Sequence, residues 1–512
     1  MDPGQGPNGD FEERELQLHL KQQLTPRDGV YLRLINYEAS GGDTLQHYHP
    51  DATIRGFRTL ERQNPVVHAG FHHEWSPGVH TLLLAGHLSG RYSVTNPAQP
   101  SLLVIKEDGV TPSFVQPIAV RLDYESELEI HTVEAQQIWE QPGWSSILGA
   151  RYQLGDYFTR ALQTDPQAGD NIGFFPTNGV AAGGRVNADF ERLSLYGYQH
   201  LDVVEELRLV AGVSYDRVWF PVNHRSPPLD RGEGDLNQVS PKAGFIWTPG
   251  LRSTVRFAYT RSVAGASFDQ SFQLEPTQVA GINQSFRSII PESVVGAGAG
   301  SRFETFGLAF DQSWAGGTYL GVSGDVLNSK ANRVVGVFDF TEAHDFTVPG
   351  RTRERLEFQE RSLTVTVNQL LGQEWAVGAR YRFSDADLTS EFPQIPDAVT
   401  VAAGTSFAPR QRVKARLHDL ELQVTHQMPS GWFSQAQAVW NHQSSSGYQP
   451  NLASEDFWQF NIFAGYRFPG RRAEIRLGVL NLTDQDYRLN PLTLYNEKPR
   501  ERTFVARLRF NF

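Results

Sequence analysis

The chain closes on Arg502-Thr-Phe-Val-Ala-Arg-Leu-Arg-Phe-Asn-Phe512, a stretch in which apolar and polar residues alternate almost perfectly. With the two-residue period of a β-strand, one face of this stretch is apolar and the other is mostly polar. The apolar face carries Phe504, Ala506, Leu508, Phe510 and Phe512. A final strand of this kind, ending on an aromatic residue, is expected of a transmembrane β-barrel, where one face meets lipid and the other a polar lumen.

The same alternation recurs along the whole chain. It appears in Leu16, Leu18 and Leu20, in Leu207, Leu209, Ala211 and Val213, in Phe306, Leu308 and Phe310, in Leu363, Val365 and Val367, in Leu420, Leu422 and Val424, and in Ile475, Leu477 and Val479. No comparably long stretch has the 3.6-residue period of a helix. The sequence therefore predicts an all-β fold, a large antiparallel transmembrane β-barrel of about 19 to 22 strands. We expect the barrel to span residues 11–512, after a disordered tail over residues 1–10.

The connections between these segments are of two alternating kinds. Tight turns are predicted at Thr25-Pro-Arg-Asp28, Ser76-Pro-Gly78, Gln141-Pro-Gly143, Thr248-Pro-Gly250, Ala315-Gly-Gly317, Gly372-Gln-Glu374, Pro429-Ser-Gly431 and Pro469-Gly470. Long polar loops are predicted over about residues 38–63, 92–124, 160–187, 222–237, 264–300, 341–354, 388–412 and 444–456. This asymmetry is typical of outer-membrane barrels, which have short periplasmic turns and long extracellular loops.

Tryptophan gathers at the tight turns. Six of the ten tryptophans lie within a few residues of one, namely Trp75, Trp144, Trp247, Trp314, Trp375 and Trp432. Indole prefers the interface between membrane and water, so this set is predicted to form an aromatic girdle at the short-turn end. The alternative is that tryptophan caps strand ends in a soluble sandwich or propeller, which gives no reason for its preference for one end.

The composition excludes several classes of protein. No stretch is apolar enough for a transmembrane helix. The chain has no cysteine, so disulfides and thiolate metal sites are excluded. Its net charge is -11 and it has no basic block, which argues against a nucleic-acid partner. No secretory signal is visible at Met1, which predicts either a cytosolic protein or a missing true start.

The stretch Asn481-Leu-Thr-Asp-Gln-Asp-Tyr487, followed by Pro491 and the final strand, resembles the carboxy-terminal signature of TonB-dependent outer-membrane receptors. The motif residues are Asn481, Leu482, Thr483, Asp484 and Tyr487. The resemblance implies a barrel of about 22 strands whose last strand is recognised by the barrel-assembly machinery. Phe504, Leu508, Phe510 and Phe512 are then the expected assembly signal.

The chain also departs from that family. Family members carry an amino-terminal plug domain and a TonB box, whereas here the alternation begins by about Glu13. About 19 strands are counted, and an odd number does not suit a closed barrel with both termini periplasmic. We therefore expect that a signal, a plug and about three strands are missing before Met1. The alternative is one miscounted strand near residues 113–125.

Few residues suggest chemistry. His47 and His49, with Asp43 and Asp51 nearby, would be a weak loop metal site, and solvated loop residues are the simpler interpretation. His72, His73 and Glu74 are adjacent in sequence, so alternation sends them to opposite faces. No nucleophile elbow, metalloprotease motif or acid pair is present, so neither an enzyme, a cofactor nor a metal site is expected.

Charged residues on the polar faces are predicted to line the lumen. They are Arg208, Asp216, Glu421, Glu474, Arg476, Arg507 and Arg509. In a plugged transporter such residues bond to the plug, and in an open pore they set ion selectivity. The simpler interpretation is cross-strand charge pairing within the wall, worth roughly 0.2 to 1 kcal/mol for each pair.

The resemblance implies import of a scarce ligand, siderophore-, corrinoid- or glycan-like, across the cell outer membrane, with capture by loops near residues 267–300 and 387–412. One alternative is a plugless passive channel, and a second is a secreted all-β binding module. The expected partners are outer-membrane lipid, the barrel-assembly machinery and a small ligand, with the TonB complex only if the full gene encodes a plug.

Overall fold

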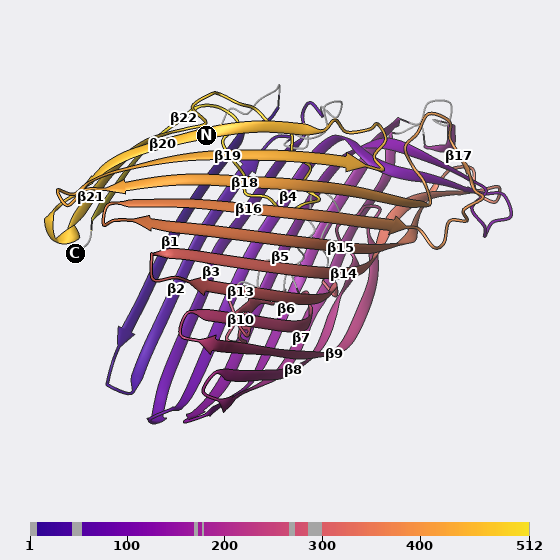
Figure 1. Ribbon diagram of the computed structural model, residues 1–512. Coiled ribbons are helices and arrows are strands. Elements are labelled where there is room, and N and C mark those ends of the chain that lie inside the picture. Colours follow the sequence, from indigo (N-terminus) through magenta and orange to yellow (C-terminus); the bar gives the residue numbers. More distant parts are fainter. Residues whose placement is uncertain are drawn as a thin grey trace.

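The computed structural model describes residues 8–43, 54–167, 173–176, 179–265, 272–284 and 299–510. His47, His49, Asp51 and Phe512 lie outside these ranges. The described chain forms one 20-stranded sheet and a separate two-stranded hairpin. Figure 1 shows the sheet curving around so that strands β1–β9 and strands β13–β22 form two facing walls of a barrel. None of the described residues forms a helix long and apolar enough to cross a membrane.

The barrel strands follow one another in chain order. In the first half they are β1 (Phe11–Gln23), β2 (Asp28–Gly41), β3 (Arg58–Ser76), β4 (Val79–Lys106), β5 (Phe114–Gln141), β6 (Trp144–Gln167), β7 (Val180–Val204), β8 (Leu207–Asn223), β9 (Asp230–Gly250) and β10 (Ser253–Val263). In the second half they are β13 (Arg302–Ser313), β14 (Thr318–Thr341), β15 (Val348–Leu371), β16 (Trp375–Glu391), β18 (Arg410–Gln427), β19 (Trp432–Ser446), β20 (Glu455–Arg467), β21 (Ala473–Leu480) and β22 (Thr503–Phe510).

The described residues also form four short elements. They are the hairpin strands β11 (Gln278–Val279) and β12 (Ile282–Asn283), the two-residue strand β17 (Thr400–Val401), and the 3-10 turn η4 (Pro469–Arg471). Apart from β17, the 20-stranded sheet consists of nineteen strands, each antiparallel to the next. The predicted all-β barrel of about 19 to 22 strands is therefore confirmed. Within the described residues, no ladder joins β1 to β22, so these two strands form the edges of the sheet.

One end of the barrel carries only short turns. Eight of its nine turns fall at or beside the predicted Pro- and Gly-containing stretches. The ninth, at Glu205 and Glu206, contains neither residue and was not predicted. Residues 8–10, expected to belong to a disordered tail, contact the β2–β3 connection, since the Asn8 side chain donates to the carbonyls of Ile54 and Phe57.

The opposite end carries longer connections, although several are shorter than predicted. The expected loop over residues 92–124 is reduced to residues 107–113, because β4 and β5 continue as paired strands far beyond the length needed to cross a membrane. The stretch near residues 113–125, the alternative site of an extra strand, is the first part of β5.

Side-chain burial is reversed relative to a soluble protein. On β6, the apolar Leu148 is 53% exposed on the outer face while the charged Arg151 is 2% exposed on the inner face. Large apolar side chains are exposed on strand after strand, whereas soluble monomers rarely expose contiguous apolar patches larger than a few hundred Å². This outer face therefore suits lipid, and polar groups gather inside the barrel.

At the long-connection end, strands from opposite walls meet. Phe338 to Thr341 of β14 pair in parallel with Leu103 to Lys106 of β4, and β17 pairs with the start of β5. A salt bridge of 2.8 Å joins Lys106 to Asp339. Buried apolar residues surround this seam, among them Leu103, Ile118, Val120, Phe175 and Phe338. A second apolar core thus stabilises this seam at the long-connection end.

Candidate functional site

A hairpin from the β10–β13 connection lies inside the barrel. We call residues 272–284 the lumen hairpin; it contains β11 and β12. Val279 and Ala280 are buried against Tyr196, Tyr198 and the inner faces of neighbouring strands. An added Cβ on Gly244 of β9 would lie 2.9 Å from the Cβ of Ala280, so the glycine allows this close approach. The connection is therefore packed onto the inner wall.

Carboxylates on the wall and on the hairpin hold this packing in place. Glu134 of β5 accepts hydrogen bonds from the backbone N–H groups of Leu274 and Glu275, at 2.9 and 3.1 Å. The Tyr196 hydroxyl donates to the same Glu134 carboxylate at 2.8 Å. The Tyr198 hydroxyl donates to the Glu275 carboxylate at 2.7 Å. Charge-assisted hydrogen bonds of this length are the strong ones, so the hairpin is held by several of them at once.

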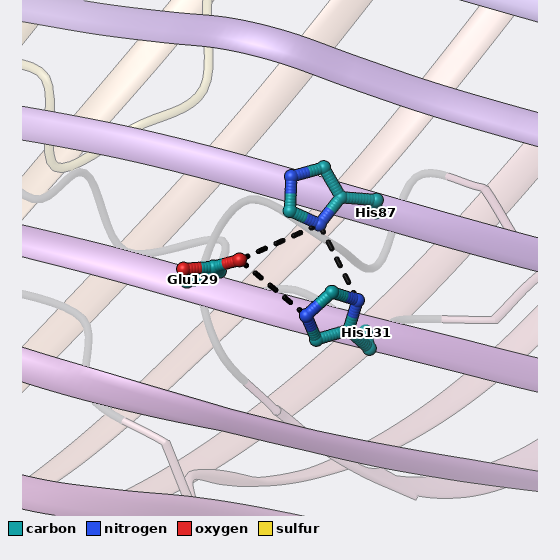
Figure 2. Close-up of side chains that lie close together, drawn as sticks. All are labelled: His87, Glu129 and His131. Atoms are coloured by element: carbon teal, nitrogen blue, oxygen red, sulfur yellow. Dashed lines mark hydrogen bonds and ion pairs between the residues drawn. The ribbon is translucent and has the colours of Figure 1, made fainter.

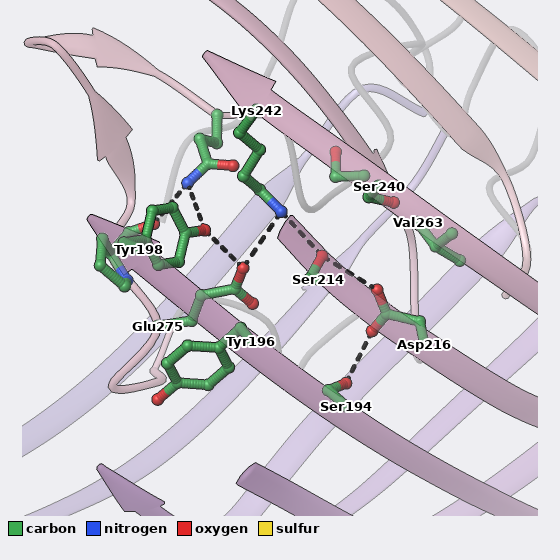
Figure 3. A network of polar contacts seen from close by, with 12 residues as sticks. Ser194, Tyr196, Tyr198, Ser214, Asp216, Ser240, Lys242, Val263 and Glu275 are labelled. Atoms are coloured by element: carbon green, nitrogen blue, oxygen red, sulfur yellow. Dashed lines mark hydrogen bonds and ion pairs between the residues drawn. The ribbon is translucent and has the colours of Figure 1, made fainter. Parts of the chain in front are cut away.

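A buried lysine connects the hairpin to a second set of charges, as Figure 3 shows. The Lys242 Nζ lies 3.4 Å from the Glu275 carboxylate and donates to the Ser214 hydroxyl at 2.7 Å. Next to Ser214, Asp216 pairs with Arg192 at 2.7 Å and accepts from the Ser194 hydroxyl. All these side chains are buried. The polar contacts therefore run without a break from the hairpin into the wall.

The hairpin reaches across to the first strands of the barrel. The Phe272 ring stacks on Tyr31 with ring centroids 5.6 Å apart, and it contacts His68 at 4.2 Å. The guanidinium of Arg33 lies 5.4 Å from the same ring. Arg151 of β6 donates to the Gln273 side chain at 2.7 Å. The lumen hairpin therefore bridges β2 and β3 on one side and β9 on the other.

Beside the hairpin, a polar cavity of about 590 Å³ opens on the inner wall near the short turns. Its lining comes from β10, β13, β14 and β15 and includes Arg256, Asp311, Thr364 and Thr366. Arg256 donates to Asp311 at 2.6 Å and also contacts the carbonyl of Gly281 in the hairpin. The uncovered part of the lumen is thus polar and adjoins the hairpin directly.

Comparison with known proteins fixes the family. The family model described as TonB dependent receptor-like, beta-barrel, matches residues 21–482. The chain belongs to the β-barrel family of TonB-dependent receptors. It is an outer-membrane transport barrel, with its short turns facing the periplasm and its long connections facing the cell exterior. These findings exclude a secreted all-β binding module.

Solved structures share this fold at low sequence identity. The ferric citrate transporter FecA in its unliganded form has a TM-score of 0.58 and 13% identity, over 97% of this chain and 69% of its own. The copper transporter OprC has a TM-score of 0.57 and 12% identity, over 99% and 72% of the two chains. The siderophore receptor PiuA from Acinetobacter baumannii has a TM-score of 0.58 and 11% identity, over 100% and 76%. No curated protein matches the chain.

In this TonB-dependent receptor barrel, strand register places the seven predicted lumen residues on the inward-facing side. Asp216 is buried, and Arg208 shares its face and pairs with Asp202 at 2.6 Å. Glu421 accepts from Gln437, and Glu474 pairs with Arg467. On the last two strands, Arg507 lies opposite Arg476, and Arg509 lies opposite Glu474. Only Asp216 belongs to the network around the lumen hairpin.

Seven deeply buried members of that network were not predicted. They are Glu134, Arg151, Arg192, Tyr196, Tyr198, Lys242 and Glu275. Six of them lie on strands, and each has at least one adjacent residue that is apolar or small, so the alternation of the strand could have placed them on the inner face. The seventh, Glu275, belongs to the long connection, where no periodic pattern identifies the face.

The C-terminal family motif folds back over the inner wall. The buried side chain of Asn481 donates to the carbonyls of Gln485 and Pro499 and accepts from the Gln485 N–H. Asp484 accepts from the N–H of Arg502 at 2.7 Å, just before β22 begins. The Tyr487 ring stacks on Phe457 at 5.2 Å and its hydroxyl donates to the carbonyl of Lys498. Burial raises the pKa of this hydroxyl. Of the two remaining motif residues, Leu482 and Thr483, the former is 40% exposed.

The predicted assembly and girdle residues lie on the outer surface. Phe504, Leu508 and Phe510 are exposed, with Phe504 at 78%. The six tryptophans at the short turns, Trp75, Trp144, Trp247, Trp314, Trp375 and Trp432, are 40 to 61% exposed. Their roles in barrel assembly and at the membrane interface stay predictions.

The neighbouring histidines of β3 go to different partners. His72 contacts His80 at 3.0 Å, whereas His73 contacts the Asp28 carboxylate at 2.7 Å. The two residues therefore do not act together as ligands.

Proposed function

We propose that this barrel imports a metal ion or a metal chelate, and that the lumen hairpin keeps its lumen closed until the ligand is bound outside. The observation that carries the proposal is the docking of the hairpin on Glu134. A carboxylate buried on the wall accepts two backbone N–H groups from a connection that begins at the extracellular end. Such a contact both closes the lumen and links it to the cell surface.

The ligand class rests on the structural relatives. Their names record transport of ferric citrate, of copper and of siderophores. The inner wall carries charges of both signs, as in Arg256 and Asp311, which suits a ligand that combines a cation with acidic or neutral donor groups. The corrinoid and glycan alternatives lack a comparable observation.

The passive channel is the rival function. It requires a lumen that is open at rest, whereas the hairpin bridges β2 and β9 across the inside of the barrel. In family members, TonB and a plug supply the energy coupling. Contacts with TonB, with lipid and with the assembly machinery are part of this proposal, on the strength of family membership.

Conductance in planar lipid bilayers distinguishes the two functions. We expect the purified chain to give almost no steady current, because the proposed closure by the hairpin blocks the lumen at rest. The double variant Glu134→Ala and Tyr198→Phe loses the hydrogen bonds of Glu134 to the hairpin backbone and of Tyr198 to Glu275, and it should open a steady pore. The control is Glu127→Ala, since Glu127 lies on the same strand and pairs with Arg91 on the outer face.

A large steady current from the unmodified chain would contradict closure and support the passive channel. A closed double variant would contradict the role of the hairpin. Heat-modifiable migration in detergent shows that each variant is folded. The ligand class is tested separately, by uptake of ⁵⁵Fe-citrate and ⁶⁴Cu in cells whose own importers are deleted. Absence of uptake for both probes would contradict the metal assignment.

A further inference from the structure

Three metal-ligating side chains converge on the outer face of the barrel, as Figure 2 shows. His87 lies on β4, directly opposite His131 on β5. Glu129 precedes His131 by two positions, so it shares the same face of the strand. The wall separates this set from the lumen, because Ile130 between them points inward and is buried. The site is therefore distinct from the transport path.

The distances between the three side chains suit coordination of one shared metal ion. The Nδ1 atoms of His87 and His131 are 3.4 Å apart. The Glu129 Oε1 lies 3.4 Å from the Nε2 of His131 and 3.9 Å from the Nδ1 of His87. One ligand atom from each residue can be chosen so that all three lie within 4.8 Å of one another. A tetrahedral zinc ion with bonds of about 2.0 to 2.1 Å holds its ligand atoms roughly 3.3 Å apart, so small side-chain movements complete the site.

The surroundings favour a cation. Asp156 of β6 lies opposite Glu129, and Asp189 of β7 lies opposite Asp156, which gives a row of three carboxylates across adjacent strands. Like charges directly opposite one another are destabilising. In the part of the chain that the structure describes, no lysine or arginine forms a salt bridge with any of the three. By contrast, Glu127 nearby is paired with Arg91.

The height of the site on the barrel is also informative. The outward side chains between the periplasmic turn and His131 are those of Gln141, Trp139, Gln137, Ala135 and Val133. A strand needs about 9 to 11 residues to cross the membrane, so His131 lies where the apolar band ends. The set therefore faces the layer of outer-leaflet headgroups, where it is open to solvent ions.

We propose that His87, Glu129 and His131 form a binding site for a divalent transition-metal ion of the zinc class. Two imidazoles and one carboxylate are the ligand set of an open zinc site, in which a fourth position is left for water or another oxygen ligand. The ion joins β4 to β5 and offsets the charge of the carboxylate row. This assignment does not depend on which ligand the barrel imports.

Cobalt substitution tests the proposal. Co²⁺ is titrated into the purified chain in detergent, and the visible absorption that reports tetrahedral coordination is followed. Zn²⁺ is then added to displace the Co²⁺. We expect one saturable site. His131→Ala, His87→Ala and Glu129→Gln should each weaken Co²⁺ binding on the order of tenfold or more, because loss of a direct ligand costs at least as much as loss of its supporting contacts.

Two control variants match these changes. Glu127→Gln removes an equal charge from the same face of β5, and His442→Ala removes an exposed histidine that also contacts a carboxylate, Asp456. Both should bind Co²⁺ as the unmodified chain does. The proposal is overturned if the unmodified chain shows no saturable binding, or if the controls lose it as fully as the ligand variants. Because all five positions are on the outer surface, heat-modifiable migration should stay unchanged.

Discussion

Arg192 and Asp216 form a salt bridge of 2.7 Å on the inner wall, with side chains only 1% and 4% exposed. Two adjacent strands carry them, and the Ser194 hydroxyl donates to the same Asp216 oxygen. Removing one partner of a buried pair leaves an uncompensated charge, which costs about 3 to 5 kcal/mol. We therefore expect Asp216→Ala to lower the free energy of unfolding by about that amount.

Urea unfolding in detergent, followed by loss of heat-modifiable migration, measures this effect. The matched control is Asp202→Ala, which breaks the pair between Asp202 and Arg208 at the periplasmic end of the same two strands. That pair is largely exposed to solvent, so its loss should cost much less than the loss of the buried pair. Equal losses in the two variants would show that burial does not distinguish the pairs.

Lys242 links the wall to the lumen hairpin, so its removal should loosen the hairpin. Lys242→Met takes away the cation beside Glu275 and the donor to Ser214. Hydrogen bonds to charged groups contribute about 1.5 to 3 kcal/mol, so amide exchange in residues 272–284 should rise on the order of 10- to 100-fold.

Hydrogen exchange with mass spectrometry reports this change. Lys330→Met is the control, because Lys330 forms an exposed pair with Glu357 on the outer face. It should leave exchange in the hairpin unaltered. Unchanged exchange in Lys242→Met would mean that the tyrosine and Glu134 contacts suffice to hold the hairpin.

The architecture could be predicted because a membrane barrel repeats one local pattern. Apolar residues at alternate positions identify each strand, and proline or glycine marks a turn such as Pro142-Gly143. The turn at Glu205 and Glu206 was missed because it needs neither residue. Loop lengths were overestimated because β4 and β5 continue as paired strands outside the membrane.

The candidate sites depend on contacts that no local pattern records. Glu134 binds backbone groups about 140 residues away in the sequence. His87 meets His131 only because β4 and β5 pair in one particular register. A shift of one residue would send one of the two histidines to the other face of the sheet.

His224 provides a pH-dependent contact in the short β8–β9 connection. Its backbone carbonyl accepts from Tyr124, its ring lies 4.5 Å from the ring of Tyr157, and burial lowers its pKa to about 3. An unfolded histidine has a pKa of about 6.5, so below that pH only the unfolded state binds the proton. The stability that the neutral ring provides is complete above pH 6.5 and is lost as the pH falls toward 3.

Each unit by which the pH falls in this window lowers the free energy of unfolding by about 1.4 kcal/mol. The protection of residues 224–229 against amide exchange should therefore fall about tenfold for each pH unit between pH 6 and 4. Exchange protection corrected for intrinsic rates measures this loss. His224→Gln should abolish the slope, whereas His344→Gln, in an exposed connection, should preserve it. A slope that survives His224→Gln would assign the effect to another group.

Asn481 combines two requirements that substitution can separate. It has a φ of 49°, in the left-handed region, and its side chain makes three hydrogen bonds that turn the β21–β22 connection toward β22. Asn481→Gly loses the side-chain bonds but tolerates the backbone conformation, whereas Asn481→Ala loses both. Alanine in this conformation costs roughly 1 to 2 kcal/mol more than glycine. The urea midpoint should therefore fall in the order Asn, Gly, Ala, and the yield of folded barrel in lipid vesicles should follow it. Equal midpoints for the two variants would show that the connection relaxes out of the left-handed conformation. A glycine variant as stable as the unmodified chain would show that the side-chain hydrogen bonds of Asn481 do not help to position β22.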